Sequence, residues 1–268
     1  MQNKVVVITG ATSGIGKALA YEFAAKGAKV VIGARTHDKL VEIAEDIKRN
    51  GGEIAYAQTD ITKEADCKNL MLTAVEMFGK IDVLINNAGI SMRALFAETQ
   101  LHVIETLMNV NFWGTVYCTK YALPYLLKEK GSVVAVSSIG GLMGLPGRIG
   151  YSASKFATNG FMESLRTENL KTGLHVLMAF PGFTASNIRN TALAADGSMQ
   201  GESPREEEKM MTAEEVAREI YSAVQKRKNK IVLTSLGKQM VFLNKFFPTW
   251  MTKQIYRVMS KEPGSPFK

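Results

Sequence analysis

The sequence has few residues that could hold a metal ion or form a disulfide framework. Only two of its 268 residues are cysteines, Cys67 and Cys118, and only three are histidines. The two cysteines lie far apart and form no C-x-x-C pair, so we expect neither a disulfide framework nor a metal site. So low a cysteine content is typical of proteins in a reducing compartment, and we expect a cytoplasmic protein.

Long apolar segments are absent as well. After four residues the chain enters an apolar run at residues 5–8, which is too short for the core of a signal peptide. No apolar run reaches the ~18 residues of a transmembrane helix, so we expect no membrane-spanning segment. The most apolar stretch, residues 240–251, is still long enough to contact a membrane surface.

Acidic residues are scarce towards the C-terminus. Residues 226–268 contain ten lysines and arginines against one acid, Glu262, whereas residues 1–225 contain 23 basic and 24 acidic residues. The overall charge of +8 therefore belongs to the tail. We expect no nucleic-acid partner, because the sequence has no zinc finger, RNP-type motif or obvious helix-turn-helix. A basic edge that faces an anionic surface agrees better with this pattern.

Apolar periodicity predicts a doubly wound α/β domain. Almost continuously apolar runs are typical of strands buried on both faces, and they occur at residues 5–8, 30–33, 53–58, 83–85, 132–137 and 175–179. The segments between them are long enough for crossover helices, which connect parallel strands in right-handed β-α-β units. We therefore expect one parallel sheet flanked by helices.

A glycine-rich turn follows the first predicted strand. Residues 9–16 read T-G-A-T-S-G-I-G and precede a predicted helix over residues 17–26. Glycines let the backbone approach a pyrophosphate, and the helix N-terminus offers this anion free N–H groups and a positive dipole end. The spacing differs from G-x-G-x-x-G and from the P-loop, which ends in Gly-Lys-Ser/Thr. We expect dinucleotide contacts from Gly10, Thr12, Ser13, Gly14, Ile15 and Gly16.

The second predicted strand ends in Ala34 and Arg35, where NAD-binding proteins normally have an acidic residue. A carboxylate would repel the 2′-phosphate of NADP, whereas a guanidinium can bind it through charge-assisted hydrogen bonds. Arg35 therefore predicts NADP(H) as the cofactor. The alternative is that Arg35 is an ordinary solvated cation, since arginine is common on surfaces.

A tyrosine and a lysine stand four residues apart at the start of a predicted helix. This spacing places Tyr151 and Lys155 on one helix face, where the cation would lower the pKa of the phenol and make it a usable acid or base. Ser138 follows the fifth predicted strand, at the sheet edge where doubly wound folds bind ligands. Its hydroxyl can bind a substrate carbonyl, whereas Ser137 points the other way and is structural.

These motifs, together with Asn86-Asn87-Ala88-Gly89, Asn111 and Pro181-Gly182, resemble the short-chain dehydrogenase/reductase family over residues 4 to about 235. The resemblance implies a single Rossmann-like domain with a parallel sheet of about seven strands. It also implies hydride transfer between a nicotinamide cofactor and a carbonyl or alcohol. The implied catalytic roles are Tyr151 as acid/base, Ser138 orienting the substrate oxygen, Lys155 also binding the nicotinamide ribose, and Asn111 holding a water of a proton relay.

The same resemblance implies further cofactor contacts at Asp60, Ile61, Asn87, Ala88, Gly89, Pro181, Gly182, Thr184 and Ser186. Asp60 matches the position near the adenine, although an aspartate there can also simply cap the turn at Thr62. Asn87 and Gly89 match a stretch that supports the sheet and lines the cofactor, and their role can also be purely structural. The segment after Pro181-Gly182 departs from the family pattern, so the usual threonine hydroxyl would have to come from Ser186.

The predicted substrate cleft has apolar walls. Met143, Leu145, Pro146 and Phe183 favour a hydrophobic, lipid-like ketone or secondary alcohol, although such residues are more often part of a protein core. Arg93 adds a cation that either holds a substrate anion or lies in solvent.

Residues 187–211 are polar and lack apolar periodicity, so they form either a mobile loop over the site or a plain surface loop. Thr212 and Glu215 then predict a capping box that begins a helix. We assign residues 1–235 to a catalytic, dinucleotide-binding domain and residues 236–268 to a basic, hydrophobic helical tail.

Residues 190–198 and the tail resemble a subgroup of the family that contains acyl-dihydroxyacetone-phosphate reductase and microsomal relatives. Those relatives carry an N-terminal membrane anchor, which we do not expect here. Aromatic and basic residues alternate in the tail, a pattern that suits peripheral contact with a membrane. The tail helices can equally close the substrate pocket or pack in an oligomer.

The sequence therefore predicts an NADP(H)-dependent oxidoreductase for a small hydrophobic carbonyl/alcohol pair, assembled as a homodimer or homotetramer. The alternative from another class is a non-catalytic NADP(H)-binding sensor or scaffold. A third is a membrane- or RNA-associated binding protein driven by its tail. Asn111, Ser138, Tyr151 and Lys155 favour the enzyme, because a scaffold needs none of them.

Overall fold

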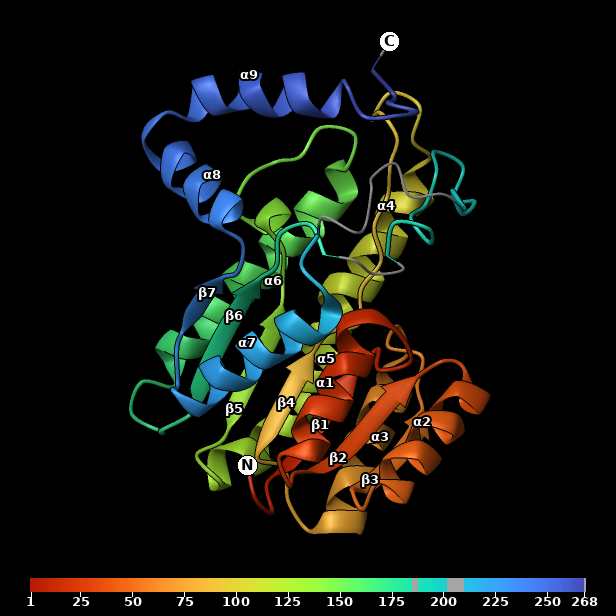
Figure 1. Cartoon of the computed structure of the whole chain (residues 1–268), viewed down its shortest axis with the longest axis vertical. Coiled ribbons are helices and arrows are strands. Elements are labelled where there is room, and N and C mark those ends of the chain that lie inside the picture. Colours follow the sequence, from red (N-terminus) through yellow and green to blue (C-terminus); the bar gives the residue numbers. More distant parts are fainter. Residues whose placement is uncertain (185–187, 202–209, 268) are drawn as a thin grey trace.

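The computed structural model describes residues 1–184, 188–201 and 210–267 of the chain. Within them, one parallel sheet of seven strands forms the centre of the molecule, in the order β3-β2-β1-β4-β5-β6-β7 (Figure 1). The strands are β1 (Val5–Thr9), β2 (Lys29–Ala34), β3 (Glu53–Gln58), β4 (Val83–Asn86), β5 (Ser132–Val136), β6 (His175–Phe180) and β7 (Lys230–Val232). The predicted α/β fold with a Rossmann-like sheet is confirmed.

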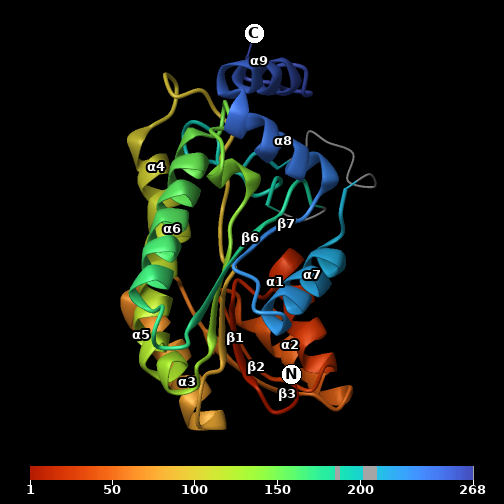
Figure 2. The ribbon, with the colours of Figure 1, turned by 90° about the vertical axis from the view of Figure 1, so that its left-hand side faces the viewer.

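Helices cover both faces of this sheet. Figure 2 shows α3, α5 and α6 on one side and α1, α2 and α7 on the other. Their bounds are α1 (Gly14–Ala25), α2 (His37–Arg49), α3 (Glu64–Phe78), α4 (Leu101–Met108), α5 (Gly114–Lys128), α6 (Ile149–Glu168) and α7 (Ala213–Gln225). Each side has its own buried apolar cluster against the strands. Burial on both faces explains why the strands are apolar at successive positions rather than alternate ones.

Two short helical turns interrupt the regular pattern, and the sequence analysis predicted neither. η1 (Asn109–Trp113) is a π-helical turn between α4 and α5, and η2 (Ile139–Gly141) is a 3-10 turn directly after β5. π-helical turns occur frequently at functional sites. η1 contains Asn111 and η2 directly follows Ser138, two residues that the sequence analysis assigned to catalysis.

Local sequence signals explain several helix ends. The capping box before α7 is present, since Glu215 N donates to Thr212 Oγ1 (3.2 Å) and Thr212 N donates to Glu215 Oε2 (2.8 Å). Gly79, with φ +79°, ends α3 in the left-handed conformation that glycine adopts without strain. Helix α1 begins at Gly14 rather than residue 17, so the last part of the glycine-rich turn forms its first turn.

The tail forms two helices at the carboxyl end of the strands (Figure 1). They are α8 (Ser235–Phe246) and α9 (Pro248–Met259). α9 packs through Met251, Ile255 and Met259 against Ile139 and Met143, and α8 adds partly buried residues such as Leu243 to the same cluster. No helix among residues 1–184, 188–201 and 210–267 is long and apolar enough to cross a membrane. The contacts of α9 with Ile139 and Met143 place the tail over the segment that follows β5.

A buried carboxylate ties three strands together at the opposite end of the sheet. Asp82 Oδ1 accepts a hydrogen bond from Lys4 Nζ (2.7 Å), and Oδ2 accepts one from Val5 N (2.8 Å) and lies 3.0 Å from Lys80 Nζ. Its backbone carbonyl accepts from Ser132 N at the start of β5 (2.8 Å). Burial raises the pKa of Asp82, but the bonds from Lys4, Val5 and Lys80 outweigh it, so the pKa lies below its usual value.

This geometry predicts that Asp82→Asn destabilises the fold by about 1–3 kcal/mol at neutral pH, because hydrogen bonds to a charged group are lost. Since the folded-state pKa is depressed, the carboxylate stabilises the fold above the ordinary aspartate pKa and loses this effect as the pH falls through the folded-state pKa. Denaturant unfolding at neutral and acidic pH measures the difference.

The matched control is Glu163→Gln, which removes the same charge from an exposed position on α6. We expect a change within about 0.5 kcal/mol for the control. A difference between wild type and Asp82→Asn that does not shrink in acid would contradict the assignment.

Candidate active site

The candidate site lies where the strand order reverses direction. β1 pairs with β2 on one side and with β4 on the other, so the connections after β1 and β4 leave the sheet edge in opposite directions. In open α/β sheets such a point, at the carboxyl ends of the strands, is where ligands bind. The glycine-rich turn and the segments after β4, β5 and β6 all begin at this edge.

The glycine-rich turn has no room for a side chain at Gly10 or Gly16. Gly10 (φ +65°) and Gly14 (φ +50°) both adopt the left-handed backbone region. A Cβ atom at Gly10 would lie 2.7 Å from Ala88 Cα, and one at Gly16 would overlap the carbonyl of Gly10. Ser13 is the N-cap of α1 without a side-chain capping bond. The first-turn N–H groups of α1, which have no partner within a helix, therefore suit a pyrophosphate.

Asn87 and Ala88 fasten this turn to the end of β4. Asn87 Nδ2 donates to Thr9 O (2.9 Å) and Gly10 O (3.1 Å). The backbone N–H groups of Asn87 and Ala88 both donate to Thr9 Oγ1 (3.0 and 3.1 Å). Both residues thus have a supporting role beside any contact with a cofactor. Thr9 is a functional residue that the sequence analysis quoted in the motif but did not assign.

The predicted adenine end of the site lies at β2 and β3. Arg35 follows β2 directly and is exposed. Asp60 Oδ1 accepts from the N–H (3.1 Å) and hydroxyl (2.8 Å) of Thr62, so it does cap this turn. Burial raises the pKa of Asp60, but the Thr62 bonds and nearby cations, including Arg35, bring it below its usual value. Ile61 is buried and packs against Gly114 at the start of α5.

Ser138 and Tyr151 meet because η2 packs tightly on α6. A Cβ atom at Gly140 would lie 3.2 Å from Tyr151 Cε1, and one at Gly141 would lie 2.7 Å from Asn159 Nδ2 and 3.1 Å from Lys155 Cβ, all on α6. Ser138 caps η2 by accepting from Gly140 N (3.1 Å) and is hydrogen-bonded to the Tyr151 side chain. These two glycines are site residues that the sequence analysis missed.

Ser137 has the structural role expected of it. Its hydroxyl donates to Asn159 Oδ1 (2.8 Å) inside the protein. Asn159 Nδ2 in turn donates to Gly141 O (2.8 Å). The side chain of Asn159 therefore holds the turn that carries Ser138 against α6.

Tyr151 and Lys155 are both buried on the first turns of α6. Lys155 Nζ lies 5.9 Å from the centre of the Tyr151 ring and donates to Val136 O (2.9 Å). Burial lowers the pKa of Lys155 to about 8. Burial also raises the pKa of Tyr151, and the Ser138 hydrogen bond and the Arg148 charge offset it only in part.

The expected direction of the Tyr151 pKa shift was therefore wrong. The spacing of Tyr151 and Lys155 predicts a cation that lowers the pKa of the phenol, but both groups are removed from water, which disfavours the phenolate. A phenol with a raised pKa stays protonated at neutral pH. The arrangement can thus donate a proton to a substrate oxygen that gains negative charge.

Asn111 lies in the π-helical turn and braces the segment after β4. Its side-chain amide donates to Ile90 O (3.0 Å) and Ser154 Oγ (2.8 Å), and its Oδ1 accepts from Ile90 N (2.9 Å). A Cβ atom at Gly89 would lie 3.1 Å from this Oδ1 and 3.4 Å from Lys155 Nζ. Asn111, Gly89 and Lys155 therefore surround one point, and Ser154 is a supporting residue that the sequence analysis missed.

The segment after β6 approaches the same edge. Pro181 O accepts from Ile139 N (3.4 Å), and a Cβ atom at Gly182 would lie 2.6 Å from Thr234 Oγ1. Thr184 is buried, and its hydroxyl donates to Gly182 O (3.3 Å). Ser186 lies outside the described residues.

Two arginines meet one carboxylate of the tail, and the charge of one of them, Arg148, acts on Tyr151. Arg93 Nη2 and Arg148 Nη2 lie 3.7 and 3.5 Å from Glu262 Oε2, and Arg93 Nη2 also donates to Pro263 O (2.6 Å). The Arg93 side chain is only 10% exposed, so the alternative that it lies in solvent is wrong. This contact fixes the end of the tail beside the site.

The described part of the predicted loop 187–211 packs on the segment after β4. Arg93 N donates to Leu193 O (2.9 Å), Leu193 N donates to Ser91 O (2.9 Å), and Gln100 N donates to Ala195 O (2.8 Å). These bonds place residues 193–195 beside the segment between β4 and α4. The sequence analysis gave no signal for this pairing.

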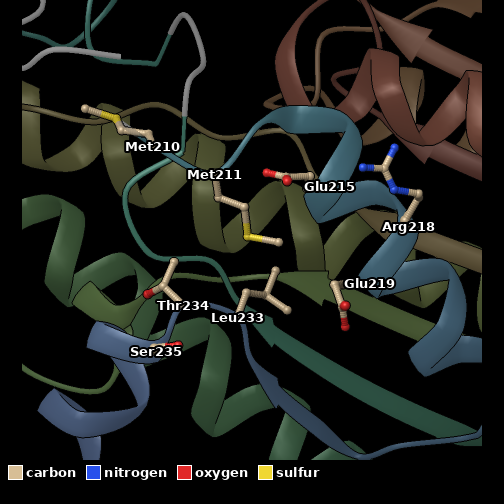
Figure 3. Close-up of a pocket in the computed structure, with 8 residues that line it drawn as sticks. All are labelled: Met210, Met211, Glu215, Arg218, Glu219, Leu233, Thr234 and Ser235. Carbon is tan, nitrogen blue, oxygen red and sulfur yellow. The ribbon is translucent and has the colours of Figure 1, made fainter. Parts of the chain in front are cut away.

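A cavity of about 560 Å³ opens beside this edge, between α7 and the end of β7 (Figure 3). It is lined by Met210, Met211, Glu215, Arg218, Glu219, Leu233, Thr234 and Ser235. None of these residues was among the predicted site residues. The cavity touches the predicted site through Thr234, whose side chain lies next to Gly182, and through Met211, which forms a β-bridge with Thr184.

Comparison with known proteins agrees with this geometry. A family model described as short chain dehydrogenase matches residues 4–196. The chain is 37% identical over 245 residues to dehydrogenase/reductase SDR family member 7B of Mus musculus, which covers 90% of this chain and 76% of that protein. It is 41% identical over 187 residues to 11-beta-hydroxysteroid dehydrogenase-like 2 of Arabidopsis thaliana, which covers 69% of this chain and 60% of the plant protein.

Solved structures show the same fold. A short-chain dehydrogenase/reductase from Burkholderia phymatum in complex with NAD has a TM-score of 0.82 at 24% identity, over 93% of this chain and 95% of that one. An alcohol dehydrogenase from the archaeon Thermococcus sibiricus, complexed with 5-hydroxy-NADP, has a TM-score of 0.78 at 24% identity, over 87% and 97%. With the family match across most of the sequence, these findings establish that the chain belongs to the short-chain dehydrogenase/reductase family of oxidoreductases.

Proposed function

We propose that the protein transfers a hydride between NADP(H) and a hydrophobic, lipid-like ketone or secondary alcohol. The observation that carries this proposal is the grouping of Ser138, Tyr151 and Lys155 at the same sheet edge as the glycine-rich turn. A scaffold that only bound a dinucleotide would need the turn but not this buried phenol and amine. Membership of an oxidoreductase family supports the same conclusion.

Several residues at this sheet edge are placed where they could bind the cofactor. The first turn of α1, from Ser13 to Gly16, would hold the pyrophosphate, and Lys155 would hold the nicotinamide ribose. When bound, the nicotinamide supplies or accepts the hydride. Backbone groups at Gly182 and Thr184 would contact the carboxamide.

Side chains of the protein donate and relay the proton. In the direction of reduction, the protonated phenol of Tyr151 donates its proton to the substrate oxygen, and the Ser138 hydroxyl orients that oxygen. The Lys155 ammonium, 5.9 Å from the ring, stabilises the phenolate that is left. Asn111 is proposed to hold a water of the proton relay with the remaining lone pair of Oδ1, because both hydrogens of its amide are already donated.

The preference for NADP(H) rests on Arg35. This residue is exposed at the end of β2, and Ala34 before it carries no acid to repel a 2′-phosphate. The two structural neighbours were solved with an NADP derivative and with NAD, so they do not distinguish the cofactors.

The preference for an apolar substrate rests on the apolar segment after β5, of which Met143 is itself buried in the cluster that packs on the tail. Met143 and Leu145 belong to an apolar cluster that continues into the tail helices. The name of the plant relative refers to a hydroxysteroid, which is an apolar alcohol. The cytoplasmic location and the homodimeric or homotetrameric state stay predictions from the sequence.

For Tyr151→Phe we expect a fall in turnover of about 10²- to 10⁴-fold with NADPH binding nearly unchanged, because only the proton donor is removed. NADPH absorbance during reduction of a panel of apolar ketones measures turnover, and NADPH fluorescence measures binding. Tyr117→Phe, which removes a hydroxyl from a half-buried ring on α5, is the control and should keep its activity. Full activity of Tyr151→Phe would refute the proton-donor role, whereas NADPH binding without turnover in the wild type would favour a sensor.

For Arg35→Asp we expect the ratio of kcat/KM for NADPH to that for NADH to fall by about 10- to 100-fold, the loss expected from removing a charge-assisted pair. Steady-state kinetics with each cofactor gives the ratio. Arg49→Asp makes the same charge change at the far end of α2 and should leave the ratio unchanged. An unchanged ratio in Arg35→Asp would remove this residue from cofactor selection.

A further inference from the structure

The corner between α8 and α9 carries an exposed aromatic cluster, which we call the corner patch. It consists of Phe242, Phe246, Phe247 and Trp250, whose side chains are between 50% and 63% exposed. The rings of Phe242 and Phe246 are in contact, with centroids 5.1 Å apart. Four large aromatic side chains within nine residues leave a contiguous stretch of apolar surface in water, and such surfaces mark interaction sites.

The corner patch does not belong to the face that closes the candidate active site. The inner face of α9 is formed by Met251, Ile255 and Met259, which are buried against Ile139 and Met143. This inner face explains the packing of the tail on the domain. The aromatic residues on the outer side have no such explanation within the described residues.

The surroundings of the corner patch are basic. Residues 235–259 contain four basic residues, Lys238, Lys245, Lys253 and Arg257, and no acidic one. All four are exposed, and Lys245 Nζ lies 5.7 Å from the centre of the Phe246 ring. Aromatic rings beside lysine and arginine are the combination that favours the interface of an anionic bilayer.

We propose that the corner patch docks on the surface of an anionic lipid bilayer. The rings would lie at the level of the headgroups, and the surrounding cations would meet the negative lipid surface. A second copy of this chain fits the patch less well. Two facing patches would bring their basic residues together, with no acidic residue in either helix pair to compensate. The proposal concerns the outer surface and does not depend on the proposed reaction.

Tryptophan fluorescence can test this docking directly. The sequence contains two tryptophans, Trp113 and Trp250, so Trp113→Phe leaves Trp250 as the reporter. The protein is mixed with vesicles of phosphatidylcholine alone and with vesicles that also contain phosphatidylserine. With the anionic vesicles, we expect Trp250 emission to move to shorter wavelength and the protein to sediment together with the vesicles. Both effects should weaken at high salt.

Substitutions then separate the aromatic and electrostatic contributions. The double variant Phe242→Ser/Phe246→Ser should bind anionic vesicles at least about tenfold more weakly, because two apolar side chains are lost. Lys245→Glu/Lys253→Glu should also weaken binding, by about tenfold or more. The matched controls are Leu170→Ser and Lys171→Glu, exposed positions between α6 and β6 at the opposite end of the sheet, which should bind as the wild type does.

Circular dichroism of each variant confirms that the tail is still folded. Absence of binding to phosphatidylserine vesicles at low salt would overturn the proposal, as would equal losses in the patch variants and their controls. Light scattering adds one more outcome. If the wild type is an oligomer that Phe242→Ser/Phe246→Ser converts to a monomer, and neither binds vesicles, the patch is a contact between copies of the chain and the proposal is wrong.

Discussion

The candidate active site depends on the close contact between the 3-10 turn η2 and helix α6. Gly140 and Gly141 leave no side chain between the two elements, so Ser138 reaches Tyr151 and the aliphatic part of Lys155 is enclosed. This contact and the apolar cluster of Met92, Ala94, Val103 and Leu107 around Tyr151 remove the phenol from water, and the amine is buried beside it. Both pKa directions follow from this burial, since it disfavours the phenolate and the ammonium alike. A phenol that stays protonated at neutral pH, near a lysine whose pKa of about 8 leaves it mostly charged there, is suited to giving a proton to a developing alkoxide.

Much of the fold could be predicted from the sequence because its causes are local. Strands buried on both faces are recorded as continuous apolar runs, and the capping box at Thr212 and Glu215 is a short-range hydrogen-bond pattern. The glycine-rich turn was recognisable from eight consecutive residues, although the atom that a side chain at Gly10 would meet, Ala88 Cα, is distant in the sequence. These features need only a few consecutive residues.

Other features depend on residues that are distant in the sequence, and local patterns do not record them. The direction of the Tyr151 pKa shift depends on burial by η2 and by distant residues such as Met92 and Leu107, not on the four-residue spacing to Lys155. Arg93 is enclosed because Glu262 and Pro263, from the far end of the chain, fold back onto it. The π-helical turn that carries Asn111 likewise depends on packing, because its amide holds Ile90 and Ser154.

The tail connects the two proposals without making either depend on the other. Its inner face covers the segment that follows Ser138, and its outer face carries the corner patch. The proposed reaction depends most on Tyr151 as the proton donor. The most direct test is a ¹³C NMR titration of protein labelled at tyrosine Cζ, with the Tyr151 signal assigned from Tyr151→Phe. The account predicts that Tyr151 ionises above the ordinary tyrosine value of 10.0 in the free protein. Ionisation of Tyr151 near neutral pH would contradict it.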